Sequence, residues 1–282
     1  MQAVANHTYQ CASIVRRNDH DRYLTVLHAR AEDRPGLFGL YAFNVEVAKT
    51  REVVTEPALG EIRLQWWRET IEELYRGQCR EHEVVKALTD LLHRRDLPEK
   101  ALIDLIDARE VDLYDEQPQT LQQLETYAER TGGGVQALAA LCVGATNGAL
   151  EAARHVGIAW ALTGLVRALP WHLNHGRVYV PADLMREEGL VDPLHTDHEQ
   201  TQALARILRR IGDRARAHLI CARQKAPSVS PEVKPVLRLA CLADGYLACL
   251  ERSGYVPDHV NYERGALGRQ LRLTWAGLTR KF

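Results

Sequence analysis

Two pairs of histidines are spaced as metal ligands often are. His172 and His175 lie three residues apart, as do His195 and His198. This spacing could present two imidazoles to one metal ion. No cysteine or third histidine lies near either pair, and Asp197 is the carboxylate that lies within the second pair. Because short spacing motifs often occur by chance, we predict that both pairs lie in solvated loops.

Acidic residues recur along one predicted helix and could carry a different chemistry. They are Asp104, Asp107, Glu110, Asp112 and Asp115. Carboxylate oxygens are ligands that Mg²⁺ prefers, so this stretch could hold the ion. A hydrated outer helix face explains the same pattern, because runs of charge are usually solvated. We adopt the hydrated face as the prediction.

Basic residues gather around the Pro-Trp dipeptide at positions 170–171. Arg167 ends an otherwise apolar helix, and His172, His175 and Arg177 follow it. An arginine in that place is costly to bury without an anionic partner. It could cap the carbonyl groups at the helix end, or it could hold a phosphate through two parallel hydrogen bonds.

Aromatic side chains lie on the predicted apolar helices, where most of them should belong to the core. They are Tyr41, Phe43, Trp66, Trp67, Trp160 and Trp171. A helix bundle could also place some of them around an apolar cavity. The sequence has no phosphate-binding glycine loop, nucleophile elbow or zinc-protease motif. The residue types alone therefore indicate a helical protein with a cavity that has a basic mouth.

The elements that must position these residues are helices. Apolar side chains recur at three- and four-residue steps in the segments 59–75, 101–114, 121–127, 204–220 and 236–250. Only the triplet 178–180 alternates as a strand would, and Thr120 with Gln123 predicts a capping box. No linker or repeat divides the chain. We predict one all-α domain over residues 1–282 with about eight to eleven helices.

Composition narrows the classes of function. Lys and Arg total 36 against 37 for Asp and Glu, which gives a net charge of −1 and argues against a nucleic-acid-binding protein. The six cysteines form no C-x-x-C pair, as is typical of a reduced compartment. The N-terminus lacks the apolar segment of a secretory signal, and residues 131–150 are too polar for a membrane span. These features predict a cytoplasmic protein and leave open a peripheral contact with the inner membrane.

The order of several segments resembles the squalene/phytoene synthase family, whose members join two prenyl diphosphates head to head. The matching segments are 40–43 (LYAF), 63–68 (RLQWWR), 127–133 (YAERTGG), 155–167 and 176–181 (GRVYVP). The resemblance implies an isoprenoid-synthase helical bundle around a central cavity.

The resemblance also implies a chemistry from which this sequence departs. Members of the family hold Mg²⁺ through two aspartate-rich helices, and the ions bind the diphosphates of the substrates. The first aspartate motif falls on residues 48–52, where Glu52 is the only carboxylate. The two aspartates of the second motif fall on Ala168 and His172. We therefore expect no catalytic residue, no metal site and no cofactor, unless Mg²⁺ is used in an altered way.

A divergent branch of the same family matches more closely. Its strings correspond to 42–46 (AFNVE) and 167–172 (RALPWH), at the places of the two aspartate motifs. That branch is linked to early assembly of respiratory complex I. The resemblance implies a non-catalytic assembly or scaffold protein whose partner is a respiratory-complex subunit or another assembly protein. The alternative is an active prenyltransferase that forms squalene, presqualene diphosphate or phytoene, in which Glu52 or Asp112 helps to rebuild a metal site.

The replaced charges suggest that the cavity binds a prenyl diphosphate or a phospholipid headgroup without metal. The candidate polar residues are Lys49, Arg51, Glu52, Arg167, His172, Arg177 and Tyr179. The candidate aromatic lining consists of Phe43, Trp66, Trp67 and Trp160. In the opposing interpretation, Arg167 and Arg177 only form structural ion pairs with glutamates across the bundle. Those glutamates would be Glu46 or Glu52.

A row of arginines in the segment 204–220 leaves one further question open. Its members are Arg206, Arg209, Arg210, Arg214 and Arg216. Such a row could contact anionic lipid, or it could face only water.

Overall fold

The computed structural model describes residues 2–225, 227, 229–256, 266–279 and 282. Within these residues sixteen α-helices, one 3₁₀-helix and one π-helix form, and no strand does. The first nine elements are α1 (Gln2–Asn18), α2 (His20–Val26), α3 (Arg34–Ala48), α4 (Thr50–Val53), α5 (Pro57–Tyr75), α6 (Glu83–Leu92), α7 (Glu99–Asp107), η1 (Glu110–Tyr114) and α8 (Leu121–Ala128). They are followed by η2 (Glu129–Gly133), α9 (Gly134–Cys142), α10 (Asn147–Arg167), α11 (Leu169–Asn174), α12 (Ala182–Glu188), α13 (His198–Gln224), α14 (Lys234–Leu237), α15 (Leu239–Arg252) and α16 (Ala266–Leu278). The all-α prediction is confirmed.

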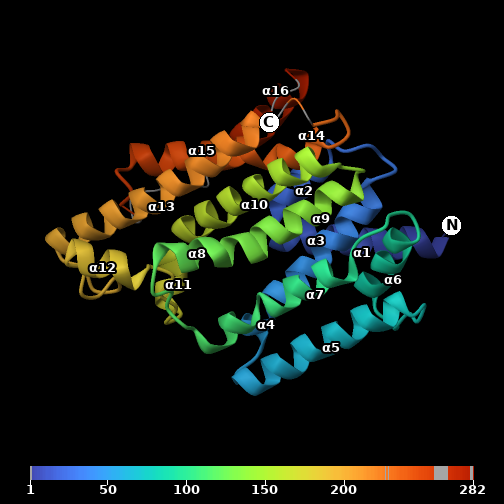
Figure 1. Cartoon of the computed structure of the whole chain (residues 1–282), viewed down its shortest axis with the longest axis horizontal. Helices are drawn as coiled ribbons and strands as arrows, with labels where there is room; N and C mark the ends of the chain where they lie inside the picture. Colours follow the sequence, from blue (N-terminus) through green and yellow to red (C-terminus); the bar gives the residue numbers. More distant parts are fainter. Residues whose placement is uncertain (1, 226, 228, 257–265, 280–281) are drawn as a thin grey trace.

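Helix α10 runs through the middle of the bundle. It packs against α13 and α15 and also against α8, α9 and η2, and Figure 1 shows it between these two groups. Its sequence is rich in alanine and glycine and is apolar on most sides. A helix of that kind is buried rather than amphipathic, and its small side chains let several neighbours approach closely.

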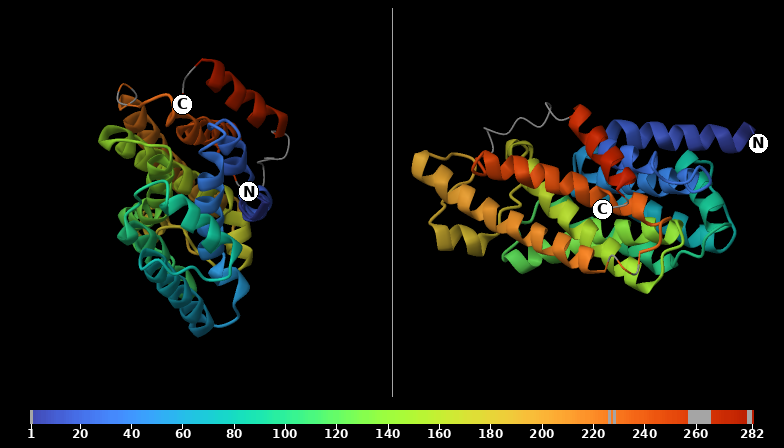
Figure 2. Two further views of the ribbon diagram at one scale, coloured as in Figure 1. Left: turned by 90° about the vertical axis from the view of Figure 1, so that its right-hand side faces the viewer. Right: turned by 90° about the horizontal axis from the view of Figure 1, so that it is seen from above.

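The N-terminal helices complete the bundle. Helices α1, α3 and α6 pack on one another, and α3 also contacts α9. Helix α5 lies at the outside, where it packs on α7 and η1 (Figures 1 and 2). This arrangement leaves the end of α3 and the start of α4 facing η1 and α10 across the middle of the molecule.

The start of α8 shows how local sequence fixes an element that the cavity needs. Thr120 Oγ1 accepts a hydrogen bond from the backbone N–H of Gln123 at 3.1 Å, as predicted for an N-cap. The Gln123 side chain accepts from the N–H of Gln119 at 2.7 Å. The reciprocal half of the capping box is therefore displaced by one residue.

The number of helices exceeds the predicted eight to eleven, because two predicted helices are divided and several elements are only one turn long. The segment 101–114 contains α7 and η1, and the segment 236–250 spans the end of α14 and most of α15. A 3₁₀ turn keeps nearly the same apolar spacing as an α-helix, so periodicity cannot reveal the break. The triplet 178–180 lies in an irregular segment.

A close contact between two backbones joins η2 to α10. A Cβ atom at Gly157 would lie 2.1 Å from the carbonyl oxygen of Gly132, so only glycine fits there. The π-helix η2 widens the chain just after Tyr127 and brings Thr131 and Gly132 to the cavity described below. Such π turns are frequent at functional sites.

Within the described part of the chain, no helix has both the length and the apolar character that crossing a bilayer would require.

Candidate functional site

A half-open cavity of ≈ 450 Å³ lies between helices of the bundle, and the family resemblance implied such a cavity. Its walls come from the end of α1, from α2, α3 and α4, from η1, α8, η2, α9 and α10, and from the segment 172–179. We call it the central cavity. Seven of the predicted site residues line it: Lys49, Arg51, Glu52, Trp160, His172, Arg177 and Tyr179.

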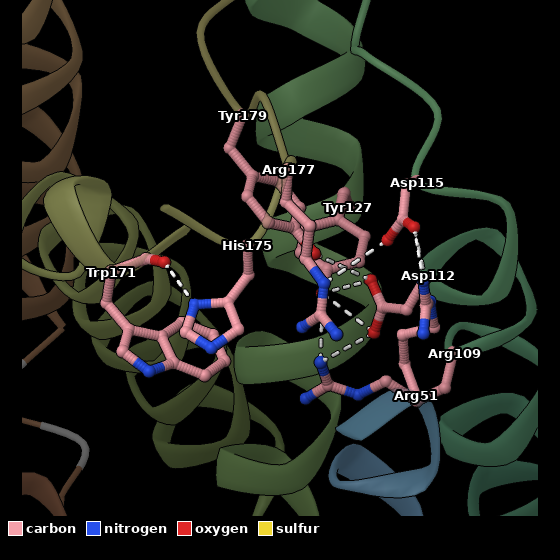
Figure 3. Close-up of polar contacts among 9 residues, drawn as sticks. All are labelled: Arg51, Arg109, Asp112, Asp115, Tyr127, Trp171, His175, Arg177 and Tyr179. Carbon is pink, nitrogen blue, oxygen red and sulfur yellow. Dashed lines mark hydrogen bonds and ion pairs between the residues drawn. The ribbon is translucent and has the colours of Figure 1, made fainter. Parts of the chain in front are cut away.

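Asp115 holds two arginines in the wall of the central cavity (Figure 3). Nη2 of Arg51 donates to Oδ2 of Asp115 at 2.6 Å, and Nε of Arg177 lies 3.2 Å from Oδ1. Asp115 has a φ angle of 51°, a left-handed conformation that aspartate tolerates better than most residues do. This turn follows η1 directly, and it places one carboxylate between α4 and the loop after α11.

Asp112 forms the second polar centre of the cavity. Its carboxylate accepts hydrogen bonds from the hydroxyl of Tyr127 at 2.9 Å and from the hydroxyl of Tyr179 at 3.1 Å. Nη1 of Arg109 donates to Asp112 at 3.2 Å and to the Tyr127 oxygen at 2.9 Å (Figure 3). Burial raises the pKa of both tyrosines, so each hydroxyl keeps its proton and remains a donor. Asp112 is only 8 % exposed, which the prediction of a hydrated acidic face did not anticipate.

The remaining cations of the cavity wall are also paired. Nζ of Lys49 lies 2.5 Å from Oε1 of Glu46, and Nη2 of Arg63 donates to Oε2 of the same carboxylate at 2.7 Å. Nη1 of Arg22 donates to Asp19 at 2.6 Å. The central cavity is thus nearly charge-balanced, whereas the sequence predicted a mainly basic pocket.

His172 lines the cavity as a neutral side chain. Burial, and next the positive charge of Arg177, lower the pKa of His172 to about 4. At neutral pH its imidazole is therefore uncharged and adds no positive charge to the cavity wall. Its Nδ1 is buried and has no hydrogen-bond partner among the residues that the structure describes. This nitrogen could donate to a ligand or accept from one.

Arg167 lies outside the central cavity. Its guanidinium carbon sits 3.4 Å from the ring centroid of Tyr246 and 6.0 Å from that of Trp160. Nη1 is also 3.8 Å from a carboxylate oxygen of Asp21. The predicted pairing of Arg167 or Arg177 with Glu46 or Glu52 is wrong, because Arg167 faces Asp21 and Arg177 faces Asp115.

Three of the four predicted aromatic lining residues lie elsewhere. Phe43 and Trp67 are in the core, with ring centroids 5.2 Å apart. Trp66 stacks edge to face on Trp67 and borders an outer groove beside α5. Helical spacing shows that a residue belongs to the apolar face of a helix. It does not show whether that residue lies in the core or lines the cavity. Trp160 alone of the four lines it.

Both histidine pairs were predicted to be solvated, and one of the four side chains is not fully exposed. His175, His195 and His198 are exposed, as expected of solvated residues, whereas His172 is half-buried. Nδ1 of His195 lies 2.9 Å from Asp192. Throughout the part of the chain that the structure covers, no three His, Cys, Asp or Glu side chains come together in a way that could hold a metal ion.

The arginine row of α13 is engaged mainly within the protein. Arg206 and Arg210 pair with Glu188 and Glu187 of α12. Arg214 donates to Glu125 of α8 at 2.7 Å. Arg216 pairs with Glu251 at 2.7 Å, and Arg209 lies over the ring of Tyr255. These contacts favour a structural role for the row over contact with lipid.

Arg109, Asp115 and the pair formed by Asp19 and Arg22 were not predicted as site residues. Asp115 was visible only as the last member of an acidic stretch. One usable signal was the end of that stretch at Gln117 and Pro118, because a turn there could direct an aspartate back toward the bundle.

The residues of the cavity do not fit Mg²⁺. The ion prefers several oxygen ligands in octahedral geometry. Asp112 and Asp115 are already bound by arginines and tyrosines, and Lys49 and Arg51 add positive charge to the same wall. A divalent cation would have to displace these cations from the carboxylates, so we derive no reaction step through Mg²⁺.

The bundle and its central cavity define the class of the protein as one with the isoprenoid-synthase helical fold. A dehydrosqualene synthase in complex with ligand superposes with a TM-score of 0.85 at 16% identity, covering 99% of this chain and 98% of that one. For squalene synthase from Alicyclobacillus acidocaldarius the TM-score is 0.78 at 19% identity, with 91% and 97% covered. Residues 15–275 match the family model of squalene/phytoene synthase. The chain belongs to the squalene/phytoene synthase family.

Two kinds of protein are among those with similar sequences. "NADH dehydrogenase (ubiquinone) complex I, assembly factor 6" from Homo sapiens is 28% identical over 257 residues, 91% of this chain and 77% of the relative. The protein of the same name from Bos taurus is 28% identical over 255 residues, 90% of this chain and 77% of the relative. 15-cis-phytoene synthase from Synechocystis is 26% identical over 267 residues, with 87% and 77% covered.

Proposed function

We propose that this protein is a non-catalytic member of its family that assists the assembly of respiratory complex I. Its human and bovine relatives are named as an assembly factor of that complex. The ion pair between Arg51 and Asp115 carries the non-catalytic part of the proposal. Arg51 lies within the segment 48–52, on which the first aspartate motif falls by resemblance, and its guanidinium group engages the nearby carboxylate of Asp115.

Electrostatics argue against the parent reaction. Head-to-head condensation requires the departure of diphosphate, and metal ions normally neutralise that leaving group. Arginine and lysine can bind a diphosphate, but in this cavity each of them already has a carboxylate neighbour. Such a site can hold an anion, yet it offers little additional positive charge to a transition state.

The same residues support a retained binding function. We propose that the central cavity binds a prenyl diphosphate or a phospholipid headgroup directly, without metal. The anion would replace Asp115 as the partner of Arg51 and Arg177, since guanidinium groups bind phosphate through parallel hydrogen bonds. Trp160, Leu165 and Val135 supply an apolar wall for the attached chain.

Deletion of the gene in its host tests the assembly role. We expect less assembled complex I on native gels and lower NADH:ubiquinone oxidoreductase activity in isolated membranes. Returning the wild-type gene should restore both, and succinate dehydrogenase activity serves as the control for general respiratory damage. An unchanged amount of complex I in the deletion strain would contradict the proposal.

Incubation of the pure protein with farnesyl or geranylgeranyl diphosphate and Mg²⁺ tests the absence of catalysis. We expect no squalene, presqualene diphosphate or phytoene. Formation of any of them would establish the alternative, an active prenyltransferase.

Calorimetric titration of farnesyl diphosphate, once with Mg²⁺ and once with EDTA, distinguishes binding that needs the metal ion from binding that does not. Equal affinity in both buffers is expected, whereas binding that requires Mg²⁺ would contradict the metal-free site.

The place of action that follows from this proposal is the cytoplasmic compartment with peripheral contact to the inner membrane. Complex I is itself a membrane complex, so an assembly factor must work close to the bilayer.

A further inference from the structure

Helix α16 presents an apolar stripe to the outside of the protein. Leu271, Trp275 and Leu278 are 69 %, 69 % and 76 % exposed. They are spaced by four and three residues, so they lie on one face of the helix. Exposed apolar residues that occur singly need no explanation, but three in one row on a terminal helix are an organised surface.

The opposite face of α16 fixes the helix to the bundle. Leu273 and Ala276 are buried, and α16 packs on α15. Nη1 of Arg269 donates to the hydroxyl of Tyr246 at 3.2 Å, and its Nε lies 3.4 Å from Asp21. The stripe is therefore held outward by contacts on the inner face. Figure 2 shows α16 as a helix laid across the outside of the molecule.

The charge of α16 differs from that of the whole chain. The helix contains Arg269 and Arg272 and no acidic residue, whereas the protein as a whole has a net charge of −1. Arg272 is exposed and lies one turn before Trp275, and its guanidinium group rests near Gly245 of α15, at the edge of the stripe that is closer to the bundle. An anionic surface would thus meet apolar side chains flanked by a positive charge.

We propose that α16 docks the protein on an anionic phospholipid bilayer. The helix lies in the plane of the interface, with Leu271, Trp275 and Leu278 inserted at the boundary of headgroups and acyl chains. Tryptophan is enriched at that depth because its ring is apolar and its N–H is polar. Arg272 contacts lipid phosphates.

The arginine row of α13 does not offer an equivalent surface. Four of its five members form ion pairs with acidic residues of the same chain, and Arg209 lies over Tyr255. The bilayer contact is therefore assigned to α16, a helix that carries fewer cations but exposes an apolar stripe.

Vesicle flotation of the full chain tests this proposal. The wild-type protein should float with vesicles of phosphatidylcholine mixed with phosphatidylglycerol and bind much less to phosphatidylcholine alone. The triple variant Leu271→Ser, Trp275→Ser and Leu278→Ser should lower the partition coefficient by roughly tenfold or more. Arg272→Gln should reduce the preference for anionic vesicles while retaining part of the binding.

The matched control removes three exposed apolar residues elsewhere. Val53, Ile62 and Val191 are 55 %, 66 % and 85 % exposed, and their replacement by serine should leave flotation unchanged. Circular dichroism and thermal unfolding confirm that each variant is folded. Equal flotation of wild type and the α16 triple variant would overturn the proposal, as would a wild-type protein that does not float.

Sedimentation velocity tests whether a second copy of the chain, rather than a bilayer, covers the apolar stripe of α16. A dimer that disappears in the α16 triple variant would assign the stripe to self-association and overturn the bilayer contact. The proposal is independent of the assembly role, because vesicle binding is measured with pure protein and complex I assembly in cells.

Discussion

Arg51 and Asp115 are 64 residues apart in sequence, yet Nη2 of the arginine donates to Oδ2 of the aspartate at 2.6 Å. Arg51 comes from α4 and Asp115 from the left-handed turn after η1. The other carboxylate oxygen of Asp115 faces Nε of Arg177 at 3.2 Å. One carboxylate thus lies between two guanidinium groups, at the place that the proposed binding assigns to a phosphate.

Asp115→Asn should strengthen the binding of an anionic ligand. The amide keeps the size of the side chain but removes the charge that competes with a diphosphate for Arg51 and Arg177. We expect the affinity for farnesyl diphosphate in EDTA to rise on the order of tenfold, measured by calorimetry. Asp104→Asn, which removes an exposed partner of Lys100, is the matched control. Unchanged affinity in the Asp115 variant would exclude Asp115 as a competitor of the ligand.

Arg177→Ala should weaken the same binding, whereas Arg167→Ala should not. Arg177 lines the central cavity, and loss of its guanidinium should lower the affinity for farnesyl diphosphate by about tenfold or more. Arg167 lies over Tyr246 outside the cavity, so its replacement should instead lower the free energy of unfolding by about 1 kcal/mol. Calorimetry and urea denaturation of both variants measure the two effects. Equal losses of affinity would place the ligand nearer to Arg167.

The sequence predicted the helices that have strong local signals. Helix α5 was predicted because its apolar residues recur at helical steps, and α8 was predicted from the cap at Thr120. The fold itself followed from the order of several short segments that resemble the family. Each of these signals lies within a short window of the chain.

The pairing of charges could not be predicted in the same way. In one of the two interpretations Glu46 or Glu52 pairs with Arg167 or Arg177, but Glu46 is occupied by Lys49 from the end of its own helix and by Arg63 from α5. Which of several carboxylates an arginine meets depends on the packing of helices distant in sequence. Helical periodicity likewise gave Phe43 and Trp67 as apolar without showing that they face the core rather than the cavity.

His172 should make the protein less stable in mild acid. Its pKa is about 4 in the folded protein and about 6.5 when unfolded, so between these values the unfolded chain binds more protons. Stability therefore falls as the pH is lowered from about 6.5 to about 4. Because His172 is only partly buried, we expect a contribution of up to about 2 kcal/mol.

Urea denaturation of wild type and His172→Gln across this pH range measures the contribution of His172. Other histidines and the carboxylates titrate in both proteins, so the difference between the two curves reports His172. The variant should lose less stability than wild type as the pH falls. His175→Gln changes an exposed neighbour and is the control. Parallel curves for wild type and His172→Gln would contradict the lowered pKa.

Two glycines of α10 should respond in opposite directions to the same substitution. A Cβ atom at Gly157 would lie 2.1 Å from the carbonyl oxygen of Gly132, and this backbone cannot move without displacing η2. We expect Gly157→Ala to lower the free energy of unfolding by about 3 kcal/mol, because overpacking between two backbones has no flexible side chain to relieve it. Displacement of η2 would also reshape the central cavity, which Gly132 lines.

Gly164 lies two turns further along the same helix, and a Cβ atom there would have no neighbour within 4 Å. Gly164→Ala should therefore stabilise the protein by about 0.5 to 1 kcal/mol, because alanine loses less backbone entropy in a helix. Urea denaturation of the two variants compares them directly. Similar small effects at both positions would mean that η2 and α10 are not in backbone contact, and the π turn would then lose its role in shaping the cavity wall.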